Sequence, residues 1–326
     1  MPMAETSSPI GAADVSAPPV CSPAAAAWLG TLLVSYSALG YATANLLLRV
    51  LVGPESQTHP FWVIGIKESV TVVLVGPVLV YQLARRRIPI PTRRTLVTIG
   101  ITGMLTQLVG NIGFLWAMSK IGVAIVTPLT QAACLIGSAL LGYIALKERV
   151  SLRSAVAILI LIAGIVTLYW GADTGLEGVH APPWVILVAV LIAVAAGIAY
   201  STLVVAIRGN VTDDASPLVV IVLVTLIGSL LLTPLAAWTT GLEGFRAITA
   251  SHWRLMLGAG FLNCTAFIAL TFGLKWTSVV RANILSTAQI VVAAMAGWLF
   301  FGEAITTAAV VGVALTLSGM VLGSKP

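Results

Sequence analysis

Charged residues are scarce in this chain, and their scarcity decides which solvent surrounds it. Asp, Glu, Lys and Arg together make up 9% of the 326 residues, whereas 59% are hydrophobic and the mean hydropathy is +1.04. A soluble protein of this length has too little interior to hide that much apolar surface. The composition therefore excludes a soluble protein and predicts one that lies in a lipid bilayer.

Cysteine, histidine and the common catalytic motifs are also rare or missing. The three cysteines, Cys21, Cys134 and Cys264, have no CxxC spacing, which argues against a disulfide framework or a metal site. The three histidines fall in or beside expected loops, and the sequence holds no HExxH, GxSxG or phosphate-loop motif. We therefore expect no enzyme and no cofactor.

What the chain does contain is a series of apolar runs. Ten runs have roughly the 17–25 residues that a helix needs to cross a bilayer, and none alternates like a barrel strand. Because backbone groups in hydrocarbon must be paired within the segment, each run is expected to be a helix. The expected spans are 28–51, 61–83, 95–118, 121–145, 151–170, 184–207, 217–238, 253–274, 279–301 and 306–323.

The segment from Lys120 to Thr167 has a counterpart, without a gap, from Lys275 to Leu322. Each copy reads as an apolar helix, a charged break with an acid (Glu148 or Glu303) and a second helix containing glycine. A membrane hairpin that recurs in this way predicts a duplicated transporter. We expect a disordered tail at 1–27, a first repeat at 28–170, an inter-repeat loop at 171–183 and a second repeat at 184–323.

Basic residues orient these spans. If the N-terminus is cytoplasmic, most Lys and Arg fall in inside loops, above all in the segment ARRRIPIPTRR at 84–94. This bias already explains the net charge of +6, so nucleic-acid binding is not needed to explain it. Five spans per half is an odd number, so the two repeats have inverted topology. We expect both termini to be cytoplasmic, in a bacterial-type inner membrane.

Two five-helix halves with these features resemble the EamA-type members of the drug/metabolite transporter superfamily. The resemblance is carried by WAMSKIGVAIVTPLTQAACLIGSALLGYIALKE in the first half and FGLKWTSVVRANILSTAQIVVAAMAGWLFFGE in the second. It implies an all-α polytopic membrane protein with ten transmembrane helices and a central cavity between two repeats. Lys67 stands where many family members have an arginine.

Polar side chains inside the spans are the candidates for lining such a cavity. In each half one helical face of small and polar residues carries a glutamine, Gln131 in span 4 and Gln289 in span 9. Close packing of helices explains the small residues, whereas an unpartnered amide in lipid costs about 2–4 kcal/mol. Each polar residue singly could instead bond to a neighbouring helix. The expected substrate-binding residues are Tyr41, Asn45, Gln107, Asn111, Thr127, Gln131, Tyr200, Asn263, Ser286 and Gln289.

Lys67 and Glu68 are the clearly charged residues placed inside a span. Adjacent helical residues point about 100° apart, so we do not expect them to pair well with each other. Lys67 can reach the interface, and Arg49 is the expected partner of Glu68. Two interpretations stay open: an ion pair that clamps spans 1 and 2, or a carboxyl that carries a proton. Glu148 and Glu303 are expected to cap the helices that follow them, beside Ser151 and Thr306.

These features favour a secondary transporter that moves a neutral or zwitterionic, amino-acid-like solute by alternating access, with export as the expected direction. Its expected partners are a small-molecule substrate and the lipid bilayer, with no nucleic acid. Two alternatives stay open: an exchanger of sugars or phosphorylated metabolites, and a non-transporting sensor or scaffold. A phosphate ligand needs convergent cations, and Lys67, Lys275 and Arg281 all lie near span ends.

Overall fold

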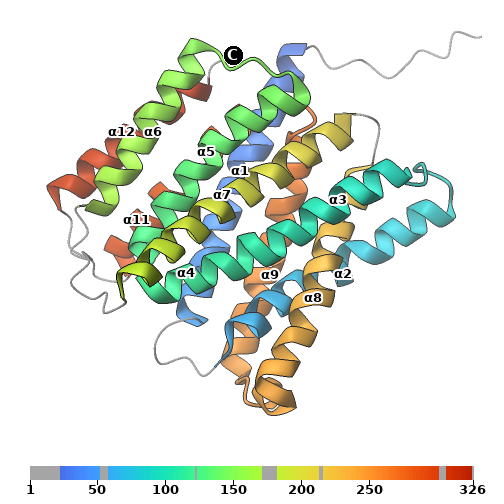
Figure 1. Cartoon of the computed structure of the whole chain (residues 1–326). Coiled ribbons are helices and arrows are strands. Elements are labelled where there is room, and N and C mark those ends of the chain that lie inside the picture. The colour runs from blue at the N-terminus through green and yellow to red at the C-terminus, as the bar shows by residue number, and fades with distance from the viewer. Residues whose placement is uncertain are drawn as a thin grey trace, which may run out of the picture.

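The computed structural model describes residues 23–51, 58–121, 123–170, 182–212, 216–300 and 306–324. Throughout these ranges the regular secondary structure is helical, without strands (Figure 1). Among the described residues, eight helices are long and apolar enough to cross a membrane, and two shorter apolar helices, Leu152–Thr167 and Thr307–Gly323, complete the expected ten. The predicted class, an all-α polytopic membrane protein, is confirmed.

The first repeat contains five spans, of which the third is built from three consecutive helical pieces. Its elements are α1 (Pro23–Leu51), α2 (Pro60–Ala84), α3 (Arg93–Leu105), the π-helix η1 (Thr106–Ile112), α4 (Gly113–Ile121), α5 (Val123–Leu146) and α6 (Leu152–Trp170). Helix α1 begins five residues before the expected first span, within the expected tail; residues 1–22 lie outside the described ranges.

The second repeat also has five spans, and its fourth is broken in two. Its elements are α7 (Pro183–Thr212), α8 (Pro217–Arg246), α9 (Ala250–Gly273), α10 (Val279–Ser286), α11 (Ala288–Phe300) and α12 (Thr307–Ser324). We expected α8 to end near residue 238, but its helical structure continues to Arg246 across Gly241. Gly241 has φ 65°, a left-handed conformation that glycine adopts without steric cost, so the chain bends there instead of ending in a long loop.

The helix contacts keep the same pattern when the two halves are exchanged. Equivalent helices pack on each other in the pairs α6–α12 and α2–α8. The contact of α1 with α9 corresponds to that of α7 with the α3–η1–α4 span, and α5–α7 corresponds to α1–α10 and α1–α11. Figure 1 shows α6 and α12 together at one edge of the bundle. This exchange pattern is the one that an inverted repeat produces.

The matching glycines of the two repeats have a structural role in the α6–α12 pair. A Cβ atom at Gly164 of α6 would lie 2.7 Å from the backbone nitrogen of Thr316, and one at Gly319 of α12 would lie 2.8 Å from Leu161 Cγ. Only glycine allows these backbones so close together, as in small-residue packing of membrane helices. The repeated glycine therefore marks the seam where the last helix of each repeat meets the other.

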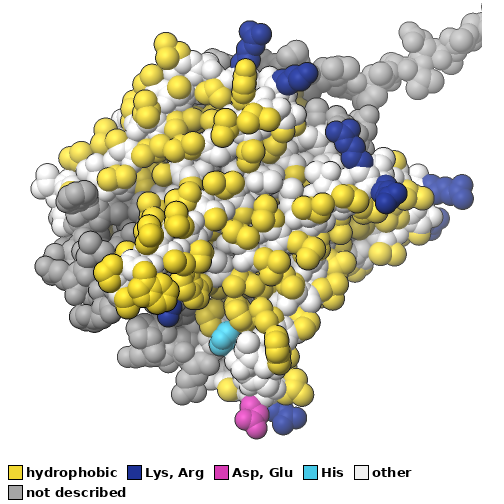
Figure 2. Space-filling view, viewed as in Figure 1, with side chains coloured by type: hydrophobic (Ala, Val, Ile, Leu, Met, Phe, Trp, Pro, Cys, Tyr) yellow, Lys and Arg dark blue, Asp and Glu magenta, His cyan; other side chains and the backbone are white. Residues whose placement is uncertain are grey.

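Hydrophobic side chains cover much of the face in Figure 2, and Lys and Arg gather at its margins. Large apolar residues are exposed along many of the spans, among them Val73, Leu159, Leu191, Leu230 and Leu299. In water so much exposed apolar surface would drive aggregation, whereas in a bilayer it contacts acyl chains. The surface therefore agrees with the composition: lipid surrounds this bundle.

Candidate functional site

The π-helical turn η1 carries the first group of polar side chains. Asn111 Nδ2 donates to Gln107 Oε1 over 2.5 Å, and Tyr200 Oη of α7 donates to Asn111 Oδ1 over 2.9 Å. Thr106 Oγ1 also donates to the carbonyl oxygen of Ala199, which fastens η1 to α7. Three predicted residues therefore form one hydrogen-bonded chain across the boundary between the repeats. Such π-helical turns are frequent at functional sites.

Glu68 lies beside the hydrogen-bonded side chains of Gln107, Asn111 and Tyr200. A Cβ atom at Gly228 of α8 would lie 2.9 Å from Gln107 Cδ and 3.0 Å from Glu68 Cγ, so both side chains rest against the same glycine. The carboxylate is also within electrostatic range of both Tyr41 and Tyr200. Helices α1, α2, η1 and α7 thus bring polar groups from both repeats to one region beside Gly228 of α8. We call this region the central polar cluster: Tyr41, Glu68, Gln107, Asn111 and Tyr200.

The expectation that Lys67 and Glu68 would pair poorly is wrong. Lys67 Nζ lies 3.3 Å from Glu68 Oε1, and the two side chains are 14% and 6% exposed. Although the two Cβ atoms point in different directions, the flexible four-carbon stem of lysine can fold back to its neighbour. The side chain of Arg49, the predicted partner of Glu68, lies outside the described residues.

A second polar group lies where α5 of the first repeat meets α10 of the second. Asn283 Nδ2 donates to Ser138 Oγ, and Ser138 Oγ donates to the carbonyl oxygen of Cys134. Near the end of α5, Gly142 approaches Val279, so the two helices run antiparallel. The sequence-based prediction did not include Asn283, because this residue is not on the helical face that carries Gln289. An asparagine inside an apolar run is the sequence feature that could have marked it as a candidate.

The two predicted glutamines lie on different helices, and one of them lies directly after a helix break. Gln131 lies on α5, and Gln289 lies near the start of α11. Helix α10 ends at Ser286 and α11 begins at Ala288, so the break directly precedes Gln289. Both amides are partly buried, and neither makes a hydrogen bond within the described ranges. Broken helices of this kind frame substrate sites in transporters built from repeats.

The remaining predicted residues lie in different surroundings. Asn263 is buried on α9, and Asn45 is exposed on α1. Ser286 bonds back to the carbonyl oxygen of Ala282 in its own helix. The side chain of Thr127 falls outside the described residues, as does Glu303. Within the described residues, the central polar cluster is therefore the place where predicted residues come together.

One end of the bundle is held by an ion pair that we call the Glu148–Arg208 clamp. Arg208 Nε lies 3.1 Å from Glu148 Oε1, and the other carboxylate oxygen accepts from the backbone nitrogen of Val279 over 3.0 Å. A terminal guanidinium nitrogen of Arg208 donates to the carbonyl oxygens of Leu274 (2.6 Å) and Lys275 (2.9 Å). The clamp joins the segment after α5 to α7, to the end of α9 and to the start of α10.

This arrangement corrects the expected role of Glu148. The carboxylate caps a helix, as expected, but that helix is α10 of the other repeat rather than α6. Helix α6 is capped by Ser151, whose hydroxyl accepts from the backbone nitrogen of Ser154. Lys147 has a left-handed backbone with φ 55°, which turns the chain sharply after α5. The inverted repeat brings the start of α10 beside this turn, which no local sequence pattern reveals.

Fold and site together define a class: a polytopic membrane protein whose two inverted five-helix repeats enclose polar side chains. Comparison with protein families identifies residues 28–170 and 187–324 as matches to the EamA-like transporter family. The chain belongs to this family, whose members are membrane transporters of small solutes. A solved structure described as "Crystal structure of protein" shares the fold, with a TM-score of 0.72 and 19% identity over 90% of this chain and 98% of that one. No curated protein matches the chain.

Proposed function

We propose that this protein is a secondary transporter that carries a neutral or zwitterionic, partly apolar organic solute by alternating access. The observation that carries the proposal is the hydrogen-bonded chain of Tyr200, Asn111 and Gln107, which joins the two repeats. Amide and phenol groups can exchange bonds with one another for bonds with the polar groups of a solute. Alternating access by rocking of one repeat against the other needs a site at that boundary.

The charges support a solute without a large net charge. Lys67, the cation nearest the central polar cluster, is already neutralised by Glu68. Lys275 is exposed at the end of α9, and Arg281 lies in the first turn of α10, so neither lies near the middle of its span. A phosphorylated solute would need several convergent cations, and the described residues near the cluster supply one.

The Glu148–Arg208 clamp supports the alternating part of the proposal. It ties α7, α9 and α10 of the second repeat to the segment that follows α5 of the first. While it is formed, this end of the bundle is held closed. We propose that this end faces the cytoplasm, as the positive-inside pattern predicts. We also propose that both termini lie on the same side of a bacterial-type inner membrane and that the direction is export.

The experiment begins with a metabolite comparison of cells that contain or lack the protein, and continues with flux in proteoliposomes. Asn111→Ala removes two hydrogen bonds of the polar chain, each worth about 0.5–1.5 kcal/mol. We expect the solute flux to fall roughly tenfold, since 1.4 kcal/mol corresponds to a factor of ten. The matched control is Asn210→Ala, because among the described residues Asn210 of α7 bonds only to its own helix, through the carbonyl oxygen of Ala206.

Three results would overturn parts of the proposal. Flux restricted to phosphorylated solutes would refute the solute class. Equal flux in the Asn111→Ala variant and the wild type would remove the polar chain from the pathway. A folded, reconstituted protein that moves none of the solutes altered in cells would favour the sensor or scaffold alternative.

A further inference from the structure

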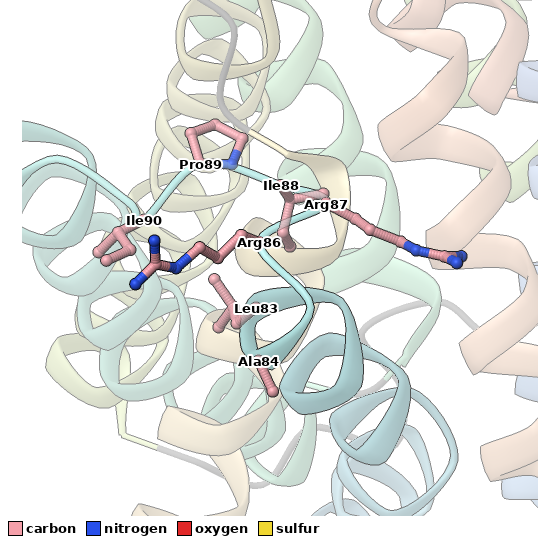
Figure 3. Close-up of a pocket in the computed structure, with 7 residues that line it drawn as sticks. All are labelled: Leu83, Ala84, Arg86, Arg87, Ile88, Pro89 and Ile90. Carbon is pink, nitrogen blue, oxygen red and sulfur yellow. The ribbon is translucent and has the colours of Figure 1, made fainter.

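The segment that joins α2 to α3 encloses a surface hollow outside the transport site. The hollow has a volume of about 600 Å³ and is lined by Leu83, Ala84, Arg86, Arg87, Ile88, Pro89 and Ile90. Arg86 has a left-handed backbone with φ 51°, so the chain turns directly after the end of α2. Figure 3 shows the result: Arg86 extends alongside Ile90, and Arg87 extends to the opposite side of the segment.

The segment carries a concentrated positive charge without compensation. Arg85, Arg86, Arg87, Arg93 and Arg94 lie within ten residues, and residues 81–96 include no Asp or Glu. None of the five arginines takes part in an ion pair in the part of the chain that the structure describes. Helix α3 begins at Arg93, so the positive end of its dipole adds to the same field.

The walls of the hollow are apolar although its rim is charged. Ile90 is 83% exposed in the middle of this basic segment, and Tyr81 is also exposed, with the guanidinium carbons of Arg85 and Arg87 at 5.5 and 5.8 Å from its ring centre. Tyrosine is enriched where a membrane meets water, because its ring is apolar and its hydroxyl polar. A soluble anion gains no favourable contact from apolar walls, whereas a phospholipid presents a phosphate to the arginines and acyl chains to the apolar side chains.

We propose that this hollow binds an anionic phospholipid of the leaflet that this end of the bundle faces. The headgroup phosphate lies against Arg86, which extends alongside Ile90, and Arg87 on the opposite side of the segment adds to the positive field (Figure 3). Ile88, Pro89 and Ile90 contact the upper part of the acyl chains. Clusters of basic residues that directly follow a transmembrane helix attract anionic lipids by about 1 kcal/mol per residue. The hollow adds shape to this general attraction and makes two of the five arginines more important than the others.

The test compares two double variants that remove the same charge from the same segment. The full-length protein is placed in nanodiscs of phosphatidylcholine doped with phosphatidylglycerol, and the bound lipids are counted by native mass spectrometry. We expect the wild type to retain phosphatidylglycerol in preference to phosphatidylcholine. In Arg86→Gln/Arg87→Gln we expect the ratio of bound phosphatidylglycerol to bound phosphatidylcholine to fall about tenfold or more. Arg93→Gln/Arg94→Gln, which leaves the hollow intact, is expected to keep most of it.

The outcomes are distinct. An equal loss in the two double variants would show a diffuse basic segment and refute a site in the hollow. Displacement of the lipid by added inorganic phosphate or glycerol phosphate would show a site for soluble anions instead. No preference for phosphatidylglycerol in the wild type would refute the proposal outright. Size-exclusion profiles verify folding, and the single variants Arg86→Gln and Arg87→Gln, each expected to lose part of the preference, replace the double variant if it does not fold.

Discussion

Loss of the Glu148–Arg208 clamp should open the end of the bundle that it holds. Arg208→Gln removes the ion pair with Glu148 and the donors to the carbonyl oxygens of Leu274 and Lys275. The carbonyls lie at the end of α9, and the carboxylate still caps α10. The variant therefore releases α7 from the segment after α5 and from the end of α9, without removing any apolar side chain from the core.

The size of the effect follows from these contacts. Hydrogen bonds to charged groups contribute about 1.5–3 kcal/mol each when well shielded. The Arg208 and Glu148 side chains are 21% and 19% exposed, so solvent screens part of the interaction. A combined loss of roughly 2–4 kcal/mol for the closed state corresponds to a shift of about 30- to 700-fold in the equilibrium between closed and open forms.

The assay measures distances between spin labels across the clamp. In a background without native cysteines, labels at the exposed positions Arg149 and Lys275 report the separation of the two repeats at this end. We expect Arg208→Gln to shift the distance distribution to longer values. Arg153→Gln is the matched control, since Arg153 lies in the first turn of α6 at the same end and forms no ion pair with any described residue.

A double-mutant cycle tests whether the two residues act together. If the clamp is the cause, Glu148→Gln and Arg208→Gln should shift the equilibrium by less in combination than the sum of their separate effects. Distances unchanged from those of the wild type, or equal shifts in Arg208→Gln and Arg153→Gln, would refute the reasoning. In either case the contacts of the clamp would not stabilise the closed state, and helix packing alone would maintain it.

Two further predictions concern the middle of the bundle. Because Glu68 pairs with Lys67 of its own helix, this pair does not hold two spans together; we expect Glu68→Gln to keep solute exchange and to lose uptake driven by a pH gradient, as measured in proteoliposomes. Loss of all transport modes together with thermal stability would instead assign Glu68 a structural role. Gln131→Leu and Gln289→Leu should each lower flux without lowering stability, because leucine is well tolerated inside a membrane bundle. Unchanged kinetics in both variants would assign the glutamines to helix packing.

The spans and their duplication could be predicted because local composition determines them. A run of apolar residues long enough to cross a bilayer has to be a helix there, wherever its neighbours lie. The matching glycines, Gly164 and Gly319, were also visible, and the structure gives them the packing role that small residues have in membranes. The same local reasoning placed Ser151 correctly at the start of α6.

The site could be predicted only in part, because its geometry depends on contacts between distant segments. Gln107 and Asn111 were both expected among the substrate-binding residues, and they do meet, but on a π-helical turn that the apolar pattern of the span does not predict. Glu148 was expected to cap the helix that follows it in the sequence, whereas the fold places it at the start of α10 in the other repeat. Asn283 was missed because its partner, Ser138, lies in the other half of the chain.

Helix α7 connects the two features that the function requires. Tyr200 bonds to Asn111 in the central polar cluster, and Arg208, eight residues further along the same helix, bonds to Glu148 in the clamp. Eight residues of α-helix span roughly 12 Å, so both contacts are carried by one rigid segment. In the proposed transport cycle, a solute that replaces Asn111 as the partner of Tyr200 acts on the helix that carries Arg208, so we propose that solute binding and the clamp are coupled through α7. The sequence of α1 repeats this spacing with Tyr41 and Arg49, so the inverted repeat supplies the same pair of residue types for the opposite end of the bundle.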